Sequence, residues 1–413
     1  MMIPNTPESS ASSDATRANR DWIVLALLLA FASTGFVQKY TGLPGVAVYV
    51  ACIITALFLI GRFSAGIAPW CRRHFRGLAV MLLVGLAACF AVLHPIEDSR
   101  GLGKSSDRDE GLDLAVTRMA EGKYPYYPSD KFAGPLSVLP GSIVLAAPFV
   151  ALGTSAYQNL FWLAAFLLMV RRVFRDAALA LCLLTVPLAL SPAVQYEYIS
   201  GGDMLANGIF VTVFFLLALE SWSNPDASNS RRWLTCVLLG VGLASRSNFL
   251  LLLPLFGAVL WRQVGLRQAI AGSGLVALAA VAIIVPFYLH DPGGFTPLLA
   301  KQKLAIVDHA LPWASKTIIG MTALAGLLGA LALLRHPAAD LHRAFFRWCA
   351  LVTLCPMFCA VSLSSLINGH PDFGFMCDRF GLMYVFFALL GWGGRMLGGA
   401  PAKPVSVENH PIT

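Results

Sequence analysis

Residues 268–289 read QAIAGSGLVALAAVAIIVPFYL and carry no charged side chain. The hydrocarbon core of a bilayer is about 30 Å thick, and an α-helix crosses it with about 17–25 apolar residues. This stretch has the required length. Its apolar residues occupy every side of a helix, as in helices surrounded by lipid and by other helices. It therefore predicts a transmembrane helix.

Eleven other stretches share this apolar character. They lie at residues 22–38, 43–61, 77–94, 156–172, 176–193, 203–220, 233–245, 249–262, 315–335, 345–367 and 378–397. The chain as a whole is 57% hydrophobic and 13% charged, whereas soluble domains carry about 25% charged residues. This composition excludes a soluble enzyme, a disordered chain and a nucleic-acid-binding domain. It predicts an all-α polytopic membrane protein with about 12–13 transmembrane helices.

One further apolar stretch, residues 135–153, differs because it carries Pro135, Pro140 and Pro148. Arg and Lys gather at the cytoplasmic ends of membrane spans. The Arg and Lys clusters of this chain agree on one orientation only if residues 135–153 do not cross completely. We therefore expect a re-entrant or interfacial hairpin there, twelve full spans and both termini in the cytoplasm. Thirteen spans are the alternative.

The expected organisation has three parts. Residues 1–20 are rich in Ser, Thr, Asn and Pro, so we expect a disordered cytoplasmic tail there. Residues 21–398 form the transmembrane domain, and residues 399–413 form a second cytoplasmic tail. The domain has two long external loops, at residues 95–134 and 290–314. We expect a multi-pass protein of a bacterial inner (plasma) membrane.

The external loop 95–134 is the most polar part of the chain and holds eight of its 22 acidic residues. Within it, apolar residues recur at positions i, i+3, i+4 and i+7, which predicts a short amphipathic helix along the membrane surface. These residues are Leu112, Ala115, Val116 and Met119, and the helix should end at Gly122. It begins with Asp107-Arg108-Asp109-Glu110, which places three carboxylates at the lipid–water boundary. Their mutual repulsion should raise at least one pKa.

Aromatic residues follow this helix in the sequence Tyr124-Pro125-Tyr126-Tyr127-Pro128. The prolines predict a rigid turn. The tyrosines fit an aromatic belt at the membrane interface, and they also fit a wall that binds sugar. Neither interpretation excludes the other.

Two other charged residues stand at predicted membrane edges. Asp203 opens an apolar span, where a carboxylate is costly and a functional role is the default hypothesis; a helix N-cap is the alternative. Arg246 falls on the external side, against the positive-inside tendency, which indicates either an anionic partner or snorkelling to lipid headgroups. The His and Cys residues show no spacing typical of a metal site, so none is expected.

Five short segments carry a resemblance to a known family. They are Asp109-Glu110, Gly122-Lys123-Tyr124-Pro125-Tyr126, Lys131 through Leu136, Gly202-Asp203-Met204-Leu205 and Asp378-Arg379-Phe380. Here the sequence resembles the integral-membrane glycosyltransferases of the GT-C fold. The resemblance implies sugar transfer from a polyprenyl-phosphate-linked donor to a glycan or lipid acceptor on the external face, without a nucleotide-binding motif. One departure is that the acidic loop follows the third predicted helix, whereas in the family it follows the first.

Such a reaction needs a base for the acceptor hydroxyl and cations for the departing phosphate. We expect Asp109 to be the base, because it lies at the anchored start of the amphipathic helix. Glu110 is the first alternative, and Asp107 is less well fixed. The expected phosphate ligands are Lys131, Arg246 and Arg379. The expected substrate-binding residues are Tyr124, Tyr126, Asp203 and His370. No cofactor is required; the alternative is a divalent cation held by Asp107 and Asp109.

A transporter or lipid flippase is the principal alternative function. It would place charged residues in the middle of its spans and show pseudo-symmetric halves. The predicted spans are almost free of charge, and the ionisable residues gather at one face. This distribution favours chemistry at the membrane surface, with membrane lipids and a lipid-linked donor as partners and no nucleic acid. A non-catalytic assembly or scaffold protein is a third hypothesis.

Overall fold

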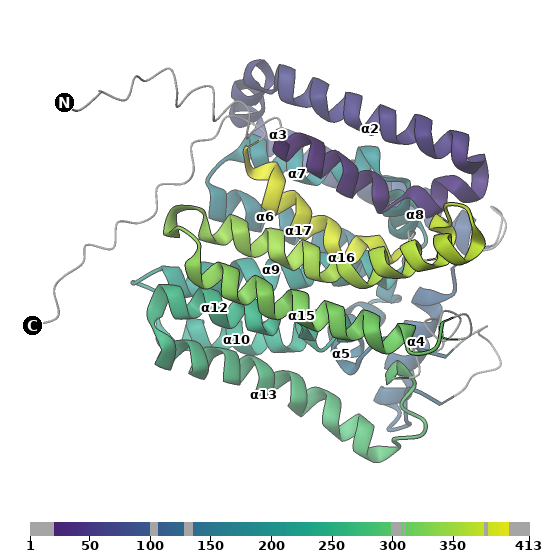
Figure 1. Cartoon of the computed structure of the whole chain (residues 1–413), viewed down its shortest axis with the longest axis vertical. Helices are drawn as coiled ribbons and strands as arrows, with labels where there is room; N and C mark the ends of the chain where they lie inside the picture. Colours follow the sequence, from purple (N-terminus) through teal and green to yellow (C-terminus); the bar gives the residue numbers. More distant parts are fainter. Residues whose placement is uncertain are drawn as a thin grey trace, which may run out of the picture.

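The computed structural model describes residues 20–99, 106–127, 135–298, 308, 311–375 and 379–395. Within these ranges the chain forms helices joined by short connections, and no β-strand (Figure 1). The all-helical prediction is confirmed for this part of the chain. The predicted tails, residues 1–20 and 399–413, lie outside it apart from Arg20, and so does Lys131.

The long helices coincide with predicted spans. Seven helices among the described residues are long and apolar enough to cross a membrane, or up to nine if each of two bent helix pairs forms one span. The longest are α2 (Thr34–Arg73), α3 (Phe75–Asp98), α9 (Asp203–Ser223), α13 (Leu266–His290), α15 (Ala314–Arg335) and α16 (Leu341–Asn368). Their length and composition support a multi-pass membrane protein.

This number is lower than the 12–13 spans predicted, because several predicted spans fold as shorter helices. These are α6 (Gln158–Phe174), α7 (Ala177–Leu190), α10 (Asn229–Leu243), α17 (Leu382–Trp392) and a helix over residues 20–31. The short helix α12 (Leu253–Val264) is not one of them, because with the residues just before it, it forms the candidate span Ser247–Val264. Caps set some of their ends: Asp176 accepts hydrogen bonds from the backbone N–H groups of Ala178 and Leu179 at the start of α7. Every residue of α17 is buried. Other helices therefore enclose α17, and its length need not match the thickness of the bilayer.

α2 continues past residue 61, where its predicted span ended. It reaches Arg73, so the basic segment that follows the predicted span is helical as well. The physical reason is that apolar side chains continue on its outer surface, where Phe63, Ile67 and Trp70 are exposed. Its first turns contain a kink at Gly42, which has φ +68°.

Two sharp bends shape one end of the bundle. α5 (Pro140–Val150) lies at 97° to the segment that contains α6, and α8 (Pro192–Ile199) lies at 89° to α7. Both helices begin with proline, which is suited to the first turn because its missing N–H is not needed there. Of the apolar stretch 135–153, only the residues of α5 are helical.

The predicted surface helix is present as α4 (Arg108–Ala120). Leu112, Ala115 and Val116 are buried, as the pattern predicted, and the chain turns at Gly122 with φ +72°. The buried face packs against residues of α5 and of the following aromatic segment in a small second core. α4 therefore lies at one end of the helix bundle (Figure 1).

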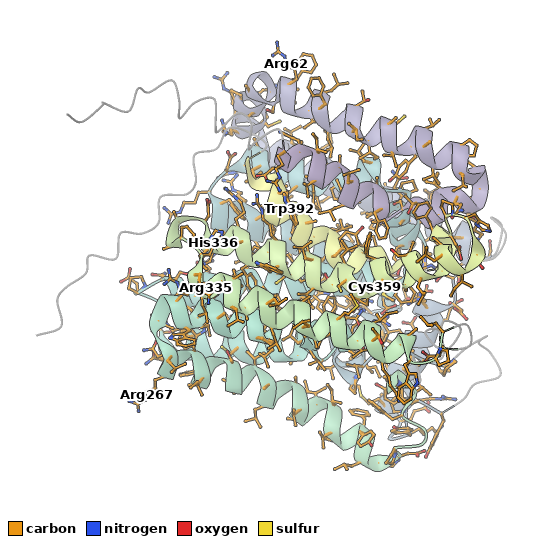
Figure 2. The ribbon with its side chains drawn as sticks, in the orientation of Figure 1. Arg62, Arg267, Arg335, His336, Cys359 and Trp392 are labelled. Carbon is orange, nitrogen blue, oxygen red and sulfur yellow. The ribbon has the colours of Figure 1, made fainter. Side chains whose placement is uncertain are left out.

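The two ends of the bundle carry different ion pairs. At one end each pair joins a long helix to a neighbouring shorter helix. The pairs are Arg72 with Asp176, Arg172 and Arg231 with Glu220, and Arg347 with Asp21. Arg267 and Arg335 lie on the left in Figure 2, whereas α4, α5 and α8 lie on the right in Figure 1. The structure thus separates an arginine-rich end from the end that carries α4.

Candidate functional site

Seven charged residues that are distant in sequence meet at the α4 end of the bundle. They are Glu97 of α3, Arg108 and Asp109 of α4, Glu197 of α8, Asp203 of α9, Arg246 just before α11 (Ser247–Leu250) and Arg379 of η5 (Arg379–Gly381). We call this group the carboxylate–arginine cluster. All four carboxylates and one of the arginines are buried. Buried charges are costly unless they are paired, so the pairing within the cluster determines what it can do.

Asp203 is the most fully paired carboxylate of the cluster. Its Oδ2 accepts hydrogen bonds from the Arg246 guanidinium and from the Asn207 side chain, the latter at 2.7 Å. Its Oδ1 accepts one from Arg108 at 3.2 Å. Gly202 occupies the N-cap position of α9, so the N-cap alternative for Asp203 is wrong. The carboxylate is instead directed to arginines from two other segments.

Glu197 is completely buried on α8. Its Oε1 accepts a hydrogen bond from the backbone N–H of Met204 at 3.0 Å, and Oε2 lies 3.7 Å from Nε of Arg379. A Cβ at Gly202 would come within 2.3 Å of Oε1. Only glycine fits there, because the backbone passes directly against this carboxylate.

Arg379 bridges Glu197 and Ser106, which lies just before α4. It donates a 2.7 Å hydrogen bond to the Ser106 hydroxyl, and its guanidinium lies 5.2 Å from the centre of the Tyr196 ring. The Glu97 carboxylate in turn accepts hydrogen bonds from the Ser106 backbone N–H at 3.0 Å and the Tyr196 hydroxyl at 3.1 Å. The side chain of Arg379 is 24% exposed, against 7% for Arg246. Of these two arginines, Arg379 is the more accessible to a ligand.

Asp109 lies beside His94 of α3. Its Oδ2 is 3.8 Å from Nε2 of His94, while Nδ1 of the same ring is 2.9 Å from the Ile199 carbonyl. A carbonyl only accepts hydrogen bonds, so Nδ1 carries a proton, and Nε2 of the neutral ring presents its lone pair towards Asp109. A Cβ at Gly201, where φ is +70°, would lie 2.9 Å from Oδ2, so glycine is required there too.

Burial, with the neighbouring Glu110 carboxylate as the second cause, raises the pKa of Asp109 to about 8. Burial also raises the pKa of Glu110. The sequence-based expectation that repulsion raises at least one pKa therefore has the right direction, but desolvation is the larger cause. The Oδ1 atom of Asp109 and the Oε2 atom of Glu110 are both buried, and no donor among the described residues reaches either of them. The two side chains interact with each other, and two carboxyl groups can share a hydrogen bond only when one of them carries a proton.

The other predicted site residues fall into four groups. Glu110 is half-buried next to Asp109, and Asp107 is exposed at the start of α4. Tyr124 and Tyr126 are buried in the second core, where their hydroxyls donate to the backbone carbonyls of Phe287 and Val138. His370 is exposed near Pro371, and within the described part of the chain it forms no hydrogen bond or ion pair with the cluster. Lys131 lies outside the described residues.

Four residues of the site were not predicted: His94, Glu97, Arg108 and Glu197. Glu197 stands in the sequence Tyr196-Glu197-Tyr198 between apolar stretches. The rule applied to Asp203, that a carboxylate at a membrane edge indicates function, applies equally to it. His94 and Glu97 follow the apolar part of α3 directly and satisfy the same rule.

An apolar groove of about 510 Å³ begins close to the His94–Asp109 pair. Residues of α3, α5 and α6 line it, among them Leu83, Phe149 and Phe161, together with Tyr157. The Tyr157 ring lies 6.1 Å from Phe90, and Phe90 stacks on His94 at 4.5 Å. A hydrocarbon chain in the groove would thus end two aromatic rings away from the cluster.

The described residues contain no group of three or more His, Cys, Asp and Glu side chains arranged to hold a metal ion. Asp107 is exposed whereas Asp109 is 4% exposed, so the two carboxylates proposed for a divalent cation have different environments.

In comparisons with family models, curated proteins and solved structures, no match to this chain was found. Its function is therefore inferred from the cluster itself.

We predict that Arg246→Ala lowers the free energy of unfolding by about 3–5 kcal/mol, because it removes a principal partner of a buried carboxylate. Adding Asp203→Asn to this variant should restore part of the loss, because the buried charge is then removed as well. Unfolding of the detergent-solubilised protein would measure both effects. Lys123→Ala, which removes an exposed ion pair with Glu121, is the control and should cost less than about 1 kcal/mol. Equal losses in Arg246→Ala and Lys123→Ala would contradict the prediction.

We also predict a pH-dependent effect of Asp109→Asn on stability. A carboxyl whose pKa rises on folding from 3.8 to about 8 binds its proton more tightly in the native state. It therefore destabilises the fold progressively as the pH rises from about 4 to about 8. The asparagine does not titrate, so the Tm of the variant relative to the native protein should increase between pH 5 and pH 9. A Tm difference that is constant with pH would contradict the raised pKa.

Proposed function

We propose that this protein is a membrane glycosyltransferase. It would transfer a sugar from a polyprenyl-phosphate-linked donor to a glycan or lipid acceptor at the membrane face that carries α4. The observation that carries the proposal is the buried Asp109 carboxyl, whose pKa is raised by burial and by Glu110, beside a cluster of three arginines at the end of an apolar helix bundle. A base and phosphate-binding cations are the two requirements of this reaction.

In the proposed step, the acceptor hydroxyl donates a hydrogen bond to Oδ1 of ionised Asp109. Its oxygen attacks the anomeric carbon of the donor as its proton moves to the carboxylate. The bond between that carbon and the phosphate oxygen breaks, and the polyprenyl phosphate leaves with the electron pair. The raised pKa of Asp109 makes its ionised form a stronger base than an ordinary carboxylate. His94 presents the lone pair of Nε2, so it would orient the carboxyl of Asp109 only in its protonated form, before and after the proton transfer.

Arg379 is the proposed contact to the donor phosphate. It is only partly buried, and its 3.7 Å separation from Glu197 exceeds hydrogen-bond distance, so a phosphate can compete for it. Arg246 is buried and bound to Asp203, and in the proposal it holds the cluster together and adds positive potential. The proposed substrate-binding residues remain Tyr124, Tyr126, Asp203 and His370. Asp203 would contribute by holding its two arginines in place. The groove beside Tyr157 would hold a lipid chain.

The proposed membrane arrangement has twelve crossings and a GT-C-like topology. The short helices α6, α7, α10, α12 and α17 would cross together with their connecting turns, enclosed by longer helices. The arginine-rich end would face the cytoplasm with both termini, in agreement with the positive-inside tendency. The α4 end would face outwards from a bacterial plasma membrane.

A lipid flippase is the second candidate. The apolar groove next to an arginine cluster favours it, because a flippase needs a path for the chain and a site for the headgroup phosphate. The two functions differ in covalent chemistry. Purified protein incubated with a radiolabelled polyprenyl-phosphate sugar and a membrane extract forms a labelled glycan or lipid only if it is a transferase.

We predict that Asp109→Asn lowers kcat in this assay by about 10²–10⁴-fold, the usual contribution of a general base. The activity of the native protein should rise with pH up to about 8, as Asp109 ionises. Glu121→Gln, at the exposed end of α4, is the matched control and should keep its activity. Near-native rates in both Asp109→Asn and Glu110→Gln would exclude this mechanism, and inhibition by EDTA would favour the divalent-cation alternative.

Arg379→Ala should raise the KM for the donor, or lower kcat if the contact strengthens as the phosphate leaves. Arg379→Lys should recover part of the loss, because it restores the charge but not the two-donor geometry. Lys316→Ala removes an exposed cation that lies over Trp313 and serves as the control. Unchanged donor kinetics in Arg379→Ala would remove this residue from the phosphate site.

A further inference from the structure

A second hollow, of about 600 Å³, lies far from the carboxylate–arginine cluster. It is formed where α2 ends and α3 begins, together with Arg171 of α6. We call it the basic hollow. The proposed glycosyl transfer makes no use of it, because α3 places His94 and Glu97 at its other end.

The basic hollow contains two arginines whose side chains have no partner within the described part of the chain. Arg73 and Arg76 are exposed, and no ion pair or hydrogen bond of their side chains occurs among the described residues. Their neighbours differ: Arg72 is paired with Asp176 at 2.7 Å, and the Arg171 guanidinium lies 4.1 Å from the centre of the Phe75 ring. The frame of the hollow is therefore held by existing contacts, and two further positive charges remain for a ligand.

The start of α3 also borders the hollow, beside the end of α2, whose terminal carbonyls carry the opposite partial charge. His74 interrupts the helix between α2 and α3, and α3 begins with neither an acidic residue in its first turn nor a side-chain cap. The start of a helix favours a negative charge through its N–H groups and its dipole. The hollow thus combines this helix start with Arg73 and Arg76.

The lining also contains apolar side chains that are exposed. Trp70 and Met81 are 54% and 66% exposed, and the half-buried Leu78 lines the hollow with them. Cations at a helix end beside exposed apolar side chains match a phospholipid, whose phosphate lies next to its acyl chains. Tryptophan is enriched at this depth of the membrane, and basic pockets between helices bind anionic headgroups.

We propose that the basic hollow binds the headgroup of an anionic phospholipid at the membrane face opposite α4. The phosphate would contact Arg73, Arg76 and the start of α3, and an acyl chain would lie along Met81 and Trp70. α2 and α3 have little protein around them, because only 17% and 11% of the residues in their most apolar stretches are buried. A bound lipid would brace these two outer helices against α6.

The test uses the full-length protein purified in detergent, with phosphatidylglycerol and phosphatidylcholine as probes and native mass spectrometry as the measurement. The native protein should retain phosphatidylglycerol in preference to phosphatidylcholine. The variant R73Q/R76Q should bind phosphatidylglycerol about 10–30-fold more weakly, since each arginine near an anionic lipid contributes about 1 kcal/mol. The control R267Q/R335Q removes two exposed arginines that do not line the hollow, and it should bind as the native protein does.

A second pair of variants tests the hollow without removing an arginine. A Cβ at Gly77 meets no atom within 4 Å, so Gly77→Glu and Gly77→Gln should both fold. Gly77→Glu brings a negative charge into the hollow and should abolish the preference for phosphatidylglycerol, whereas Gly77→Gln should keep most of it.

Equal phosphatidylglycerol binding by R73Q/R76Q and R267Q/R335Q would overturn the proposal, because general surface charge would then explain the binding. Equal effects of Gly77→Glu and Gly77→Gln would overturn it as well. A last measurement tests whether inorganic phosphate competes with phosphatidylglycerol for the hollow. If it displaces the lipid completely at similar concentrations, the hollow is a site for a soluble phosphate and not for a lipid.

Discussion

The buried carboxylate of Asp203 is the constraint on which the site end of the molecule depends. It begins α9, most of which is enclosed by other helices, and its charge is compensated by arginines from α4 and from the turn before α11. In apolar surroundings neither sign can be left alone. α4 therefore cannot move off the bundle without separating Arg108 from Asp203. Because Asp109 is the next residue, the same ion pair keeps it beside His94.

The charges of the cluster also restrict what can bind there. Arg108, Arg246 and Arg379 face the carboxylates of Glu97, Glu197 and Asp203, so these groups are balanced, and Asp109 is mostly protonated at neutral pH because its pKa is near 8. In the proposed function, an anionic ligand would compete with a carboxylate for one of the arginines. Arg379 meets Glu197 at a longer distance than Arg246 or Arg108 meets Asp203. This asymmetry favours Arg379 as the contact of the proposed donor phosphate.

Local sequence patterns predicted the helices better than they predicted the site. The apolar runs located α13 and α15 almost to the residue, and four apolar positions located α4. The extension of α2 was missed, because hydropathy ends a span at Arg62 although the helix continues. Arg108 was missed for another reason: its partner Asp203 lies 95 positions away, and one sequence contains no record of such a pairing. Glu197 stands at a membrane edge, as Asp203 does, so the rule that selected Asp203 could have selected it too. Asp109, Asp203, Arg246 and Arg379 were found because charge at a membrane edge is informative without knowing its partner.

The separation of arginine-rich and carboxylate-rich ends has an electrical consequence. An energised membrane that is negative inside exerts a force on every charge it contains, equivalent to about 2.3 kcal/mol per elementary charge per 100 mV. In the proposed orientation this force holds exposed arginines such as Arg267 and Arg335 on the inner side and draws the acidic segment around α4 outwards. The respiratory potential of the cell would therefore reinforce the direction in which the chain is inserted, and a collapse of that potential would remove this contribution without breaking any contact in the fold.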